Sequence, residues 1–231
     1  MSDPDNDIFD LRDRVIVVTG AASGLGREMA DEFLSRGARV VACDVDRDSL
    51  EGFRPSSGEA RLERRPADIS KIPEAEALIE DTIAKYGALD AVFCNAGISG
   101  GPGFSIGGTL ENQSFDVWQR HLGVNLMGSF AVARVAAIHM KKAGKGSIVF
   151  TTSAAATRAS GLSSYVYQAG KAAVAQLMRA MALDLAASNV RVNAIAPGAF
   201  GTGIGGGKLK SDPDMMALFA KRTAFGRIGS P

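Results

Sequence analysis

Short apolar runs alternate along this chain with longer stretches of helical character, and this alternation restricts the possible folds more than any other feature. The apolar runs span residues 15–19, 39–43, 88–94, 147–151 and 190–195, with a weaker candidate at 62–67. The predicted helices span about 24–36, 73–86, 114–142 and 165–187. Because most of the runs are continuously apolar, they fit strands of a parallel sheet that is covered on both faces. The sequence therefore predicts an α/β fold with one domain over residues 1–231, a Rossmann-type doubly wound parallel β-sheet with helices on both faces.

The first predicted strand runs directly into the loop TGAASGLG, and a predicted helix follows at once. Glycines let a backbone turn tightly and approach a pyrophosphate, and the start of a helix offers unpaired N–H groups to the anion. We therefore expect a dinucleotide to bind at Gly20, Ser23, Gly24, Leu25 and Gly26. The alternative interpretation is a tight turn without a ligand.

Asp44 ends the second predicted strand, 18 residues after Gly26. An acid at this place accepts hydrogen bonds from the ribose hydroxyls of adenosine and would repel a 2′-phosphate. Ser23, in the loop, is neutral and would not attract that phosphate. The sequence therefore predicts NAD as the cofactor, and the alternative is a surface Asp that merely ends a strand.

The GxxxGxG spacing of the loop resembles the short-chain dehydrogenase/reductase family, and further motifs follow in the family's order over residues 10–231. Tyr167 and Lys171 match its YxxxK motif, and Cys94 stands where its NNAG motif usually has the first Asn. The other matches are, in chain order, Asp68 and its neighbour Ile69; Asn95, Ala96 and Gly97; Asn125; Ser153; and Pro197, Gly198 and Thr202. The resemblance implies that Asp68 contacts the adenine and that Thr202 lies near the nicotinamide amide.

Tyr167 and Lys171 are four residues apart, so on a helix their side chains share one face. A free tyrosine has a pKa of about 10, and a nearby ammonium favours the phenolate. We expect Tyr167 to take the alcohol proton while hydride leaves the carbon, and to return it in the reverse direction. The resemblance implies that Lys171 also contacts the nicotinamide ribose and that Asn125 holds a water that relays protons to this lysine.

Ser153 is expected to hydrogen-bond the substrate oxygen. Ser153 and Tyr167 are 14 residues apart, one more than is usual in the family, so Thr152 is a rival for this role. Each match also has a structural alternative: Ser153 as a polar end of a strand, Asn125 as a satisfied core amide, and Asp68 as a strand-end cap.

Composition and spacing argue against several other classes. The net charge is +1, without a basic stripe, so we expect no nucleic-acid partner. His121 and His139 have no Cys, Asp or Glu at ligand spacing, so no metal site is predicted and both are expected to face solvent or bond locally. The sequence begins without a signal peptide, and the apolar stretch 124–140 is not a convincing membrane span. The two cysteines are interpreted as buried reduced thiols. We therefore expect a cytoplasmic protein and no membrane partner.

The predicted function is an NAD-dependent oxidoreductase that transfers hydride between nicotinamide and a secondary alcohol, diol or ketone. The alternatives are an NADPH-dependent 3-oxoacyl or ketone reductase and a non-catalytic dinucleotide-binding regulator. We expect a small or medium, mostly uncharged substrate, walled by residues 98–113 and 199–225, by Ala154 and Ala155, and by Tyr165, with 199–225 as a mobile lid. The resemblance implies a homodimer or homotetramer. It also implies a further helix and a last core strand after Arg227, which we expect to be missing from residues 1–231.

Overall fold

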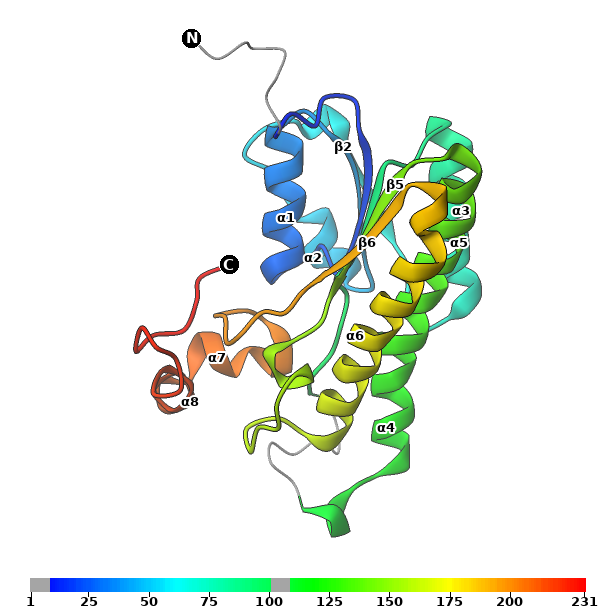
Figure 1. The fold of residues 1–231 in the computed structure, drawn as a ribbon. Helices are drawn as coiled ribbons and strands as arrows, with labels where there is room; N and C mark the ends of the chain where they lie inside the picture. The colour runs from blue at the N-terminus through cyan, green and yellow to red at the C-terminus, as the bar shows by residue number, and fades with distance from the viewer. Residues whose placement is uncertain (1–8, 101–108) are drawn as a thin grey trace.

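Six parallel strands form one sheet in the computed structural model, which describes residues 9–100 and 109–231 (Figure 1). The strands are β1 (Val15–Thr19), β2 (Arg39–Asp44), β3 (Leu62–Pro66), β4 (Ala91–Cys94), β5 (Gly146–Thr151) and β6 (Val190–Ile195). Their order is β3-β2-β1-β4-β5-β6, so the direction of winding reverses between β1 and β4. In such sheets ligands bind outside the carboxyl ends of the strands at this reversal. The predicted doubly wound fold is confirmed.

Helices cover both faces of the sheet. In Figure 1, α1 (Gly24–Ser35) and α2 (Arg47–Glu51) lie on one side, and α3 (Ile72–Tyr86), α5 (Ser129–Ala143) and α6 (Tyr165–Leu185) lie on the other. The helix α4 (Phe115–Leu122) precedes α5, and the short helices α7 (Lys208–Ser211) and α8 (Pro213–Ala220) follow β6 near the carboxyl ends of the strands. Short 3-10 turns occupy Glu59–Arg61, Leu110–Asn112, Ala154–Ala156, Ala186–Ser188 and Ile204–Gly207.

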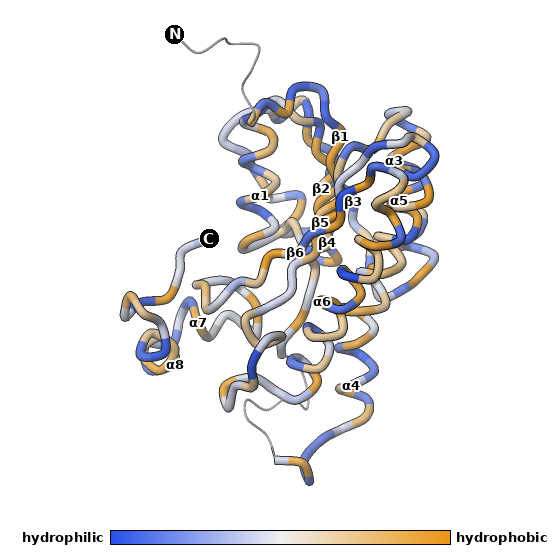
Figure 2. The backbone as a smooth tube through the Cα atoms, in the orientation of Figure 1, coloured by the Kyte–Doolittle hydropathy of each residue, from blue (hydrophilic) through white to orange (hydrophobic). Residues whose placement is uncertain are grey.

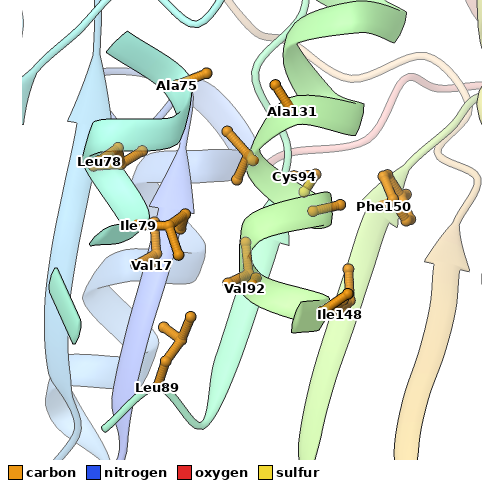
Figure 3. Packing of buried hydrophobic residues seen from close by; sticks show 14 of the residues in the cluster. Val17, Ala75, Leu78, Ile79, Leu89, Val92, Cys94, Ala131, Ile148 and Phe150 are labelled. Atoms are coloured by element: carbon orange, nitrogen blue, oxygen red, sulfur yellow. The ribbon is translucent and has the colours of Figure 1, made fainter. Parts of the chain in front are cut away.

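The strands β1 and β2 are apolar on both sides because each face of the sheet has its own core. Successive side chains of a strand point to opposite faces. Ile16 and Val18 of β1 pack with α1 and α2, whereas Val17 packs against α3 and α5. Figure 3 shows the second of these cores, with Val17 near Ile79, and Figure 2 shows the apolar strands enclosed by helices with hydrophilic outer faces. This double burial explains the continuous apolar runs in the sequence.

Two predicted elements have different bounds in the structure. The strand expected over 88–94 begins only at Ala91, and the Asp90 carboxylate just before it accepts the Val15 N–H at 3.0 Å. The helix expected over 114–142 is α4 and α5, joined by a π-helical turn over Gly123–Gly128. The stretch Phe115–Ala143 is long and apolar enough to cross a membrane by length and composition, but half of its apolar window is buried in the fold, as in a core helix.

The helices α2, α7 and α8 were not expected from the hydrophobic pattern. They are 5, 4 and 8 residues long, too short to show a helical period in the sequence. Capping defines two of them: Asp46 accepts the Ser49 N–H before α2, and Asp212 accepts the Asp214 and Met215 N–H groups before α8. The segment expected to be a glycine-rich lid therefore contains the helical turns α7 and α8, and its mobility stays a prediction.

Candidate active site

A cavity of about 1520 Å³ opens at the carboxyl ends of the strands. Its lining brings together the glycine loop, the residues that follow β2, β3, β4, β5 and β6, and the α7–α8 region. The predicted site residues that line it are Gly20, Ser23, Gly24, Leu25, Asp44, Asp68, Ile69, Asn95, Ala96, Gly97, Ser153, Tyr167, Lys171, Pro197, Gly198 and Thr202. Gly26 and Asn125 lie behind this surface and act on it indirectly.

The glycine loop is packed too closely for side chains. A Cβ on Gly26 would overlap the Gly20 carbonyl oxygen and lie 2.5 Å from the Asn95 side-chain nitrogen. Gly20 and Gly24 have φ angles of +70° and +54°, in the left-handed region that favours glycine. The first turn of α1 therefore presents its backbone to the cavity, which fits the pyrophosphate of a dinucleotide.

Thr19, at the end of β1, ties the loop to the neighbouring strands, and the sequence analysis missed it. Its buried hydroxyl donates to the Phe93 carbonyl at 3.3 Å and accepts the N–H groups of Asn95 and Ala96 at 3.1 Å. Asn95 then donates to the Thr19 carbonyl at 3.1 Å and accepts the Thr151 hydroxyl at 3.1 Å. The ends of β1, β4 and β5 are therefore fixed together beneath the cavity. A polar residue that ends an otherwise apolar buried strand was the available signal.

Asp44 holds its carboxylate at the edge of the cavity through two backbone contacts. One oxygen accepts the Ala22 N–H at 3.0 Å and the other accepts the Asp46 N–H at 3.0 Å. Asp68 is held similarly, because one of its oxygens accepts both the N–H and the hydroxyl of Ser70, at 3.0 and 2.7 Å. The strand-end turn expected as an alternative for Asp68 is thus present, on a residue that also lines the cavity.

Asn125 lies in the π-helical turn and is almost completely buried. Its side-chain oxygen accepts the Ile98 N–H at 2.8 Å, and its side-chain nitrogen donates to the Ile98 carbonyl at 2.9 Å. A Cβ on Gly97 would lie 3.1 Å from the Asn125 oxygen and 3.2 Å from the Lys171 Nζ. The amide therefore holds the backbone after β4 against the lysine, and the water relay expected for Asn125 stays a prediction.

Lys171 and Tyr167 lie on one face of α6, as their spacing predicts. The Lys171 Nζ donates to the Thr151 carbonyl at 2.7 Å and lies 5.9 Å from the centre of the Tyr167 ring. Lys171 is only 3% exposed, and this burial lowers its pKa to about 8. Burial also raises the pKa of Tyr167, against the lowering effect of a hydrogen bond with Ser153. Without cofactor, desolvation therefore has the largest effect on the pKa of Tyr167, and the phenolate expected beside the ammonium and an oxidised nicotinamide stays a prediction.

The two candidate hydroxyls after β5 have different surroundings. Thr152 donates its hydroxyl to the Ile195 carbonyl at 2.9 Å, so its proton is used inside the fold. Ser153 accepts the Ala155 N–H at 3.1 Å, and its hydroxyl lies on the cavity side, where it hydrogen-bonds Tyr167 instead of a backbone carbonyl of the fold. Of the two, Ser153 has the geometry of a hydroxyl that can donate to a substrate.

Some expectations about the substrate wall were wrong and others lie outside the described residues. Tyr165 is 44% exposed and does not line the cavity, whereas Ile98, Phe200 and Ile204 do. Within the expected wall over 98–113, residues 101–108, which include the apolar Phe104 and Ile106, fall outside the described residues.

The histidines do not form a metal site in the described ranges, where no group of three or more His, Cys, Asp or Glu side chains could hold an ion. His121 is fully buried rather than solvent-facing, and its Nδ1 lies 2.9 Å from the Val117 carbonyl, the local bond that was the other expectation. Burial lowers the pKa of His121.

Comparison with known proteins matches this arrangement to one family. The family model for short chain dehydrogenases matches residues 14–212. (+)-Borneol dehydrogenase 1 of Salvia officinalis is 35% identical over 215 residues, covering 91% of this chain and 79% of that protein. Cis-4-hydroxycyclohexanecarboxylate dehydrogenase of Sinomonas cyclohexanicum is 35% identical over 222 residues, covering 95% and 85%. The crystal structure of 3-ketoacyl-(acyl-carrier-protein) reductase from Brucella melitensis complexed with NADH is similar with a TM-score of 0.84 and 30% identity, covering 96% of this chain and 87% of that one.

Proposed function

The chain belongs to the short-chain dehydrogenase/reductase family, and on that premise we propose that it is an NAD-dependent oxidoreductase of secondary alcohols, diols or ketones with Tyr167 as its acid and base. Membership makes it an oxidoreductase of alcohols or ketones that uses a nicotinamide dinucleotide. One observation carries the finer proposal: Ser153, Tyr167 and Lys171 meet at the wall of a cavity whose other end is the glycine loop.

The preference for NAD rests on Asp44. Its carboxylate is fixed by two backbone N–H groups where an adenosine ribose would lie, so it can accept from ribose hydroxyls and would repel a 2′-phosphate. The basic residues among the described cavity lining are Arg158, Lys171 and Arg222, and none of them belongs to the glycine loop or follows β2 or β3. The similar Brucella reductase was crystallised as a complex with NADH, which agrees with this preference.

The residues of this chain can hold and move the proton of the reaction. When bound, the nicotinamide would supply the carbon that takes or returns the hydride. Ser153 is positioned to donate to the substrate oxygen, and Tyr167 to exchange the proton of that oxygen. Because burial raises the pKa of Tyr167, its hydroxyl retains a proton that it can give to a ketone. In the oxidative direction, the Lys171 ammonium, fixed by the Thr151 carbonyl, stabilises the phenolate that receives the alcohol proton.

The chain offers a matched control for this assignment. Turnover would be followed at 340 nm with NAD+ or NADP+ and a panel of cyclic and linear secondary alcohols and diols, and with the reduced cofactors and ketones. We expect Tyr167→Phe to lower kcat/KM by roughly 10²–10⁴-fold, the contribution of general acid–base catalysis. Tyr165→Phe removes a hydroxyl two residues away, outside the cavity lining, and should change the rate by less than about threefold.

A Tyr167→Phe enzyme as active as the Tyr165→Phe enzyme would refute the role of Tyr167. Tight binding of NADH without turnover of any substrate would instead favour a dinucleotide-binding regulator. The relatives indicate which alcohols to include: by their names, one acts on the neutral terpene alcohol borneol and one on a hydroxy acid built on cyclohexane. Both neutral and acidic alcohols therefore belong in the panel.

We also propose that the protein assembles as a homodimer or homotetramer through α5 and α6. Ile138 of α5 is 47% exposed and Leu183 of α6 is 83% exposed, and exposed apolar side chains of this size favour burial against another surface. Light scattering on the purified protein tests this, and a monomer at micromolar concentration would contradict it.

A further inference from the structure

Charge is distributed unevenly along the cavity, and this distribution bears on the substrate class of the proposed reaction. Its acidic lining residues within the described chain are Asp44 and Asp68, which follow β2 and β3 where the adenosine half of the cofactor would lie. The segments after β5 and after α8 contribute Arg158 and Arg222 to the lining, and no acidic residue that the structure describes. Residues 101–108 add no charge, because their sequence, GPGFSIGG, contains no ionisable side chain.

Arg158 and Arg222 have no hydrogen bond or ion pair from their guanidinium groups to any described residue. Other arginines of the chain do have partners: Arg14 is 3.0 Å from Asp90, and Arg134 is 2.6 Å from Glu76. Both cavity arginines are exposed, so their charges remain hydrated and available. Two exposed cations in the lining of one cavity, without ion-pair partners among the described residues, attract an anion to it.

The segments that carry these arginines also supply apolar side chains to the cavity. The large ones come from the segment after β5 and from the α7–α8 region: Leu162, Ile204, Leu209, Met215, Leu218 and Phe219. A lining that combines apolar side chains with two guanidinium groups fits a molecule with a hydrocarbon skeleton and an anionic end. Guanidinium groups bind carboxylates well because their paired N–H groups match the two oxygens.

The segment that carries Arg158 is fixed to the helix that carries Tyr167. Gln168, the next residue on α6, accepts the Ser160 N–H at 2.8 Å and donates to the carbonyls of Ser160 and Ser163 at 3.2 and 2.8 Å. This amide thus holds the chain after Arg158 through two hydrogen bonds to Ser160 and one to Ser163. The backbone of the arginine is therefore placed relative to the reacting hydroxyl before any substrate binds.

We propose that the substrate is a hydroxy acid or oxo acid whose carboxylate is bound by Arg158 and Arg222 while its hydroxyl or carbonyl oxygen lies at Ser153 and Tyr167. The position of the reacting oxygen of the substrate rests on the proposed function. The position of its carboxylate rests on the two arginines alone. It replaces the expectation of a mostly uncharged substrate.

A binding experiment tests the anionic end without requiring turnover. Cyclohexanecarboxylate and its neutral analogue cyclohexanecarboxamide would be titrated calorimetrically into the full chain saturated with NAD+. We expect the acid to bind about tenfold more tightly than the amide, as for two charge-assisted contacts at a solvated cavity mouth. In the double variant Arg158→Gln/Arg222→Gln the preference should fall to less than about twofold.

Arg61→Gln/Arg191→Gln is the matched control. It also removes two exposed positive charges, but from residues near the amino ends of β3 and β6, at the opposite edge of the sheet. The control should keep the tenfold preference. Equal binding of acid and amide, no measurable binding of the acid, or an equal loss of preference in both double variants would each overturn the proposal.

A parallel assay at 340 nm separates this proposal from the proposed function. The substrates would be 4-hydroxycyclohexanecarboxylate and its carboxamide. If both are oxidised at equal kcat/KM, the hydride-transfer function stands and the anionic site is wrong. If neither compound is oxidised but the acid still binds more tightly than the amide and this preference depends on the two arginines, the anionic site stands and the proposed reaction is wrong.

Discussion

Asp44→Asn is the substitution that tests the assignment of the cofactor most directly. It removes one negative charge from the cavity and leaves the shape of the side chain almost unchanged. Both Asp44 oxygens accept a backbone N–H, from Ala22 and from Asp46, each at 3.0 Å. Asparagine can accept only one of these and would turn its NH2 group toward the other. We expect the variant to fold with a loss of stability of about 1 kcal/mol, the net contribution of one hydrogen bond that is not buried.

The effect on cofactor choice follows from the charge of a 2′-phosphate. At a separation of about 4 Å, two unit charges interact by about 1 kcal/mol at the dielectric constant of water. A 2′-phosphate carries nearly two negative charges, so repulsion by the solvent-facing carboxylate weakens the binding of NADP+ by about 2 kcal/mol, or roughly 30-fold in affinity. The substitution should restore this affinity for NADP+. The substitution should also lower the affinity for NAD+ about threefold to tenfold, because a ribose hydroxyl then donates to a neutral oxygen instead of a charged one.

The ratio of kcat/KM for NADP+ to that for NAD+ should thus rise about 100-fold. Steady-state rates at 340 nm with one alcohol and both cofactors measure it. Asp46→Asn is the control, because it also removes one negative charge, two residues after Asp44. The Asp46 side chain caps α2 and does not line the cavity. The reasoning fails if the wild-type protein already favours NADP+, if the ratio moves less than threefold, or if Asp46→Asn moves it equally.

Three further predictions concern the site and its scaffold. Gly26→Ala should cost at least about 1–3 kcal/mol in urea unfolding, because the new methyl overlaps a backbone carbonyl, whereas Gly161→Ala, with open space around it, should cost under about 1 kcal/mol. Ser153→Ala should lower kcat about 10²–10³-fold. Thr152→Val loses an internal hydrogen bond, so it should lower the free energy of unfolding by about 1 kcal/mol and leave kcat within about threefold of wild type. A large loss of kcat in Thr152→Val but not in Ser153→Ala would assign the reacting hydroxyl to Thr152. Because burial lowers the pKa of Lys171 to about 8, its contribution to the stability of the cofactor-free protein is present above its unfolded pKa of 10.5 and is lost as the pH falls toward 8. Lys171→Met should therefore gain stability relative to wild type between pH 9.5 and 7.5 in urea unfolding, and a constant difference would contradict the lowered pKa.

The parts of this molecule that the sequence predicted are those set by local pattern. The strand and helix alternation predicted the sheet because each apolar run is buried by the element next to it in the chain. The four-residue spacing of Tyr167 and Lys171 placed them on one face of α6, since helical geometry alone determines that relation. Interactions between distant residues were not predictable in this way. Thr19 meets Asn95 across 76 residues, and no periodicity in the sequence reports such a contact.

The π-helical turn and the pKa of Tyr167 illustrate a second kind of difference. A 3.6-residue period and a π turn differ by one inserted residue, so the apolar pattern of 114–142 did not distinguish them. For Tyr167 the sequence supplied the neighbouring charge of Lys171 but not the depth of burial. Burial has the larger effect on the pKa, and it raises it.

The spacing between Ser153 and Tyr167 is one residue longer than is usual in the family, yet both residues line the cavity together. The intervening chain is anchored independently at each end: Ser153 caps the 3-10 turn Ala154–Ala156, and Gln168 holds Ser160 and Ser163 against α6. An added residue between these anchors is therefore absorbed without moving the reacting pair. The same segment carries Arg158, so its length and composition can alter the lining of the cavity while Ser153 and Tyr167 stay in place. Under the proposed function, the motif residues would therefore carry the chemistry, and the choice of substrate would depend on a segment that the motifs do not constrain.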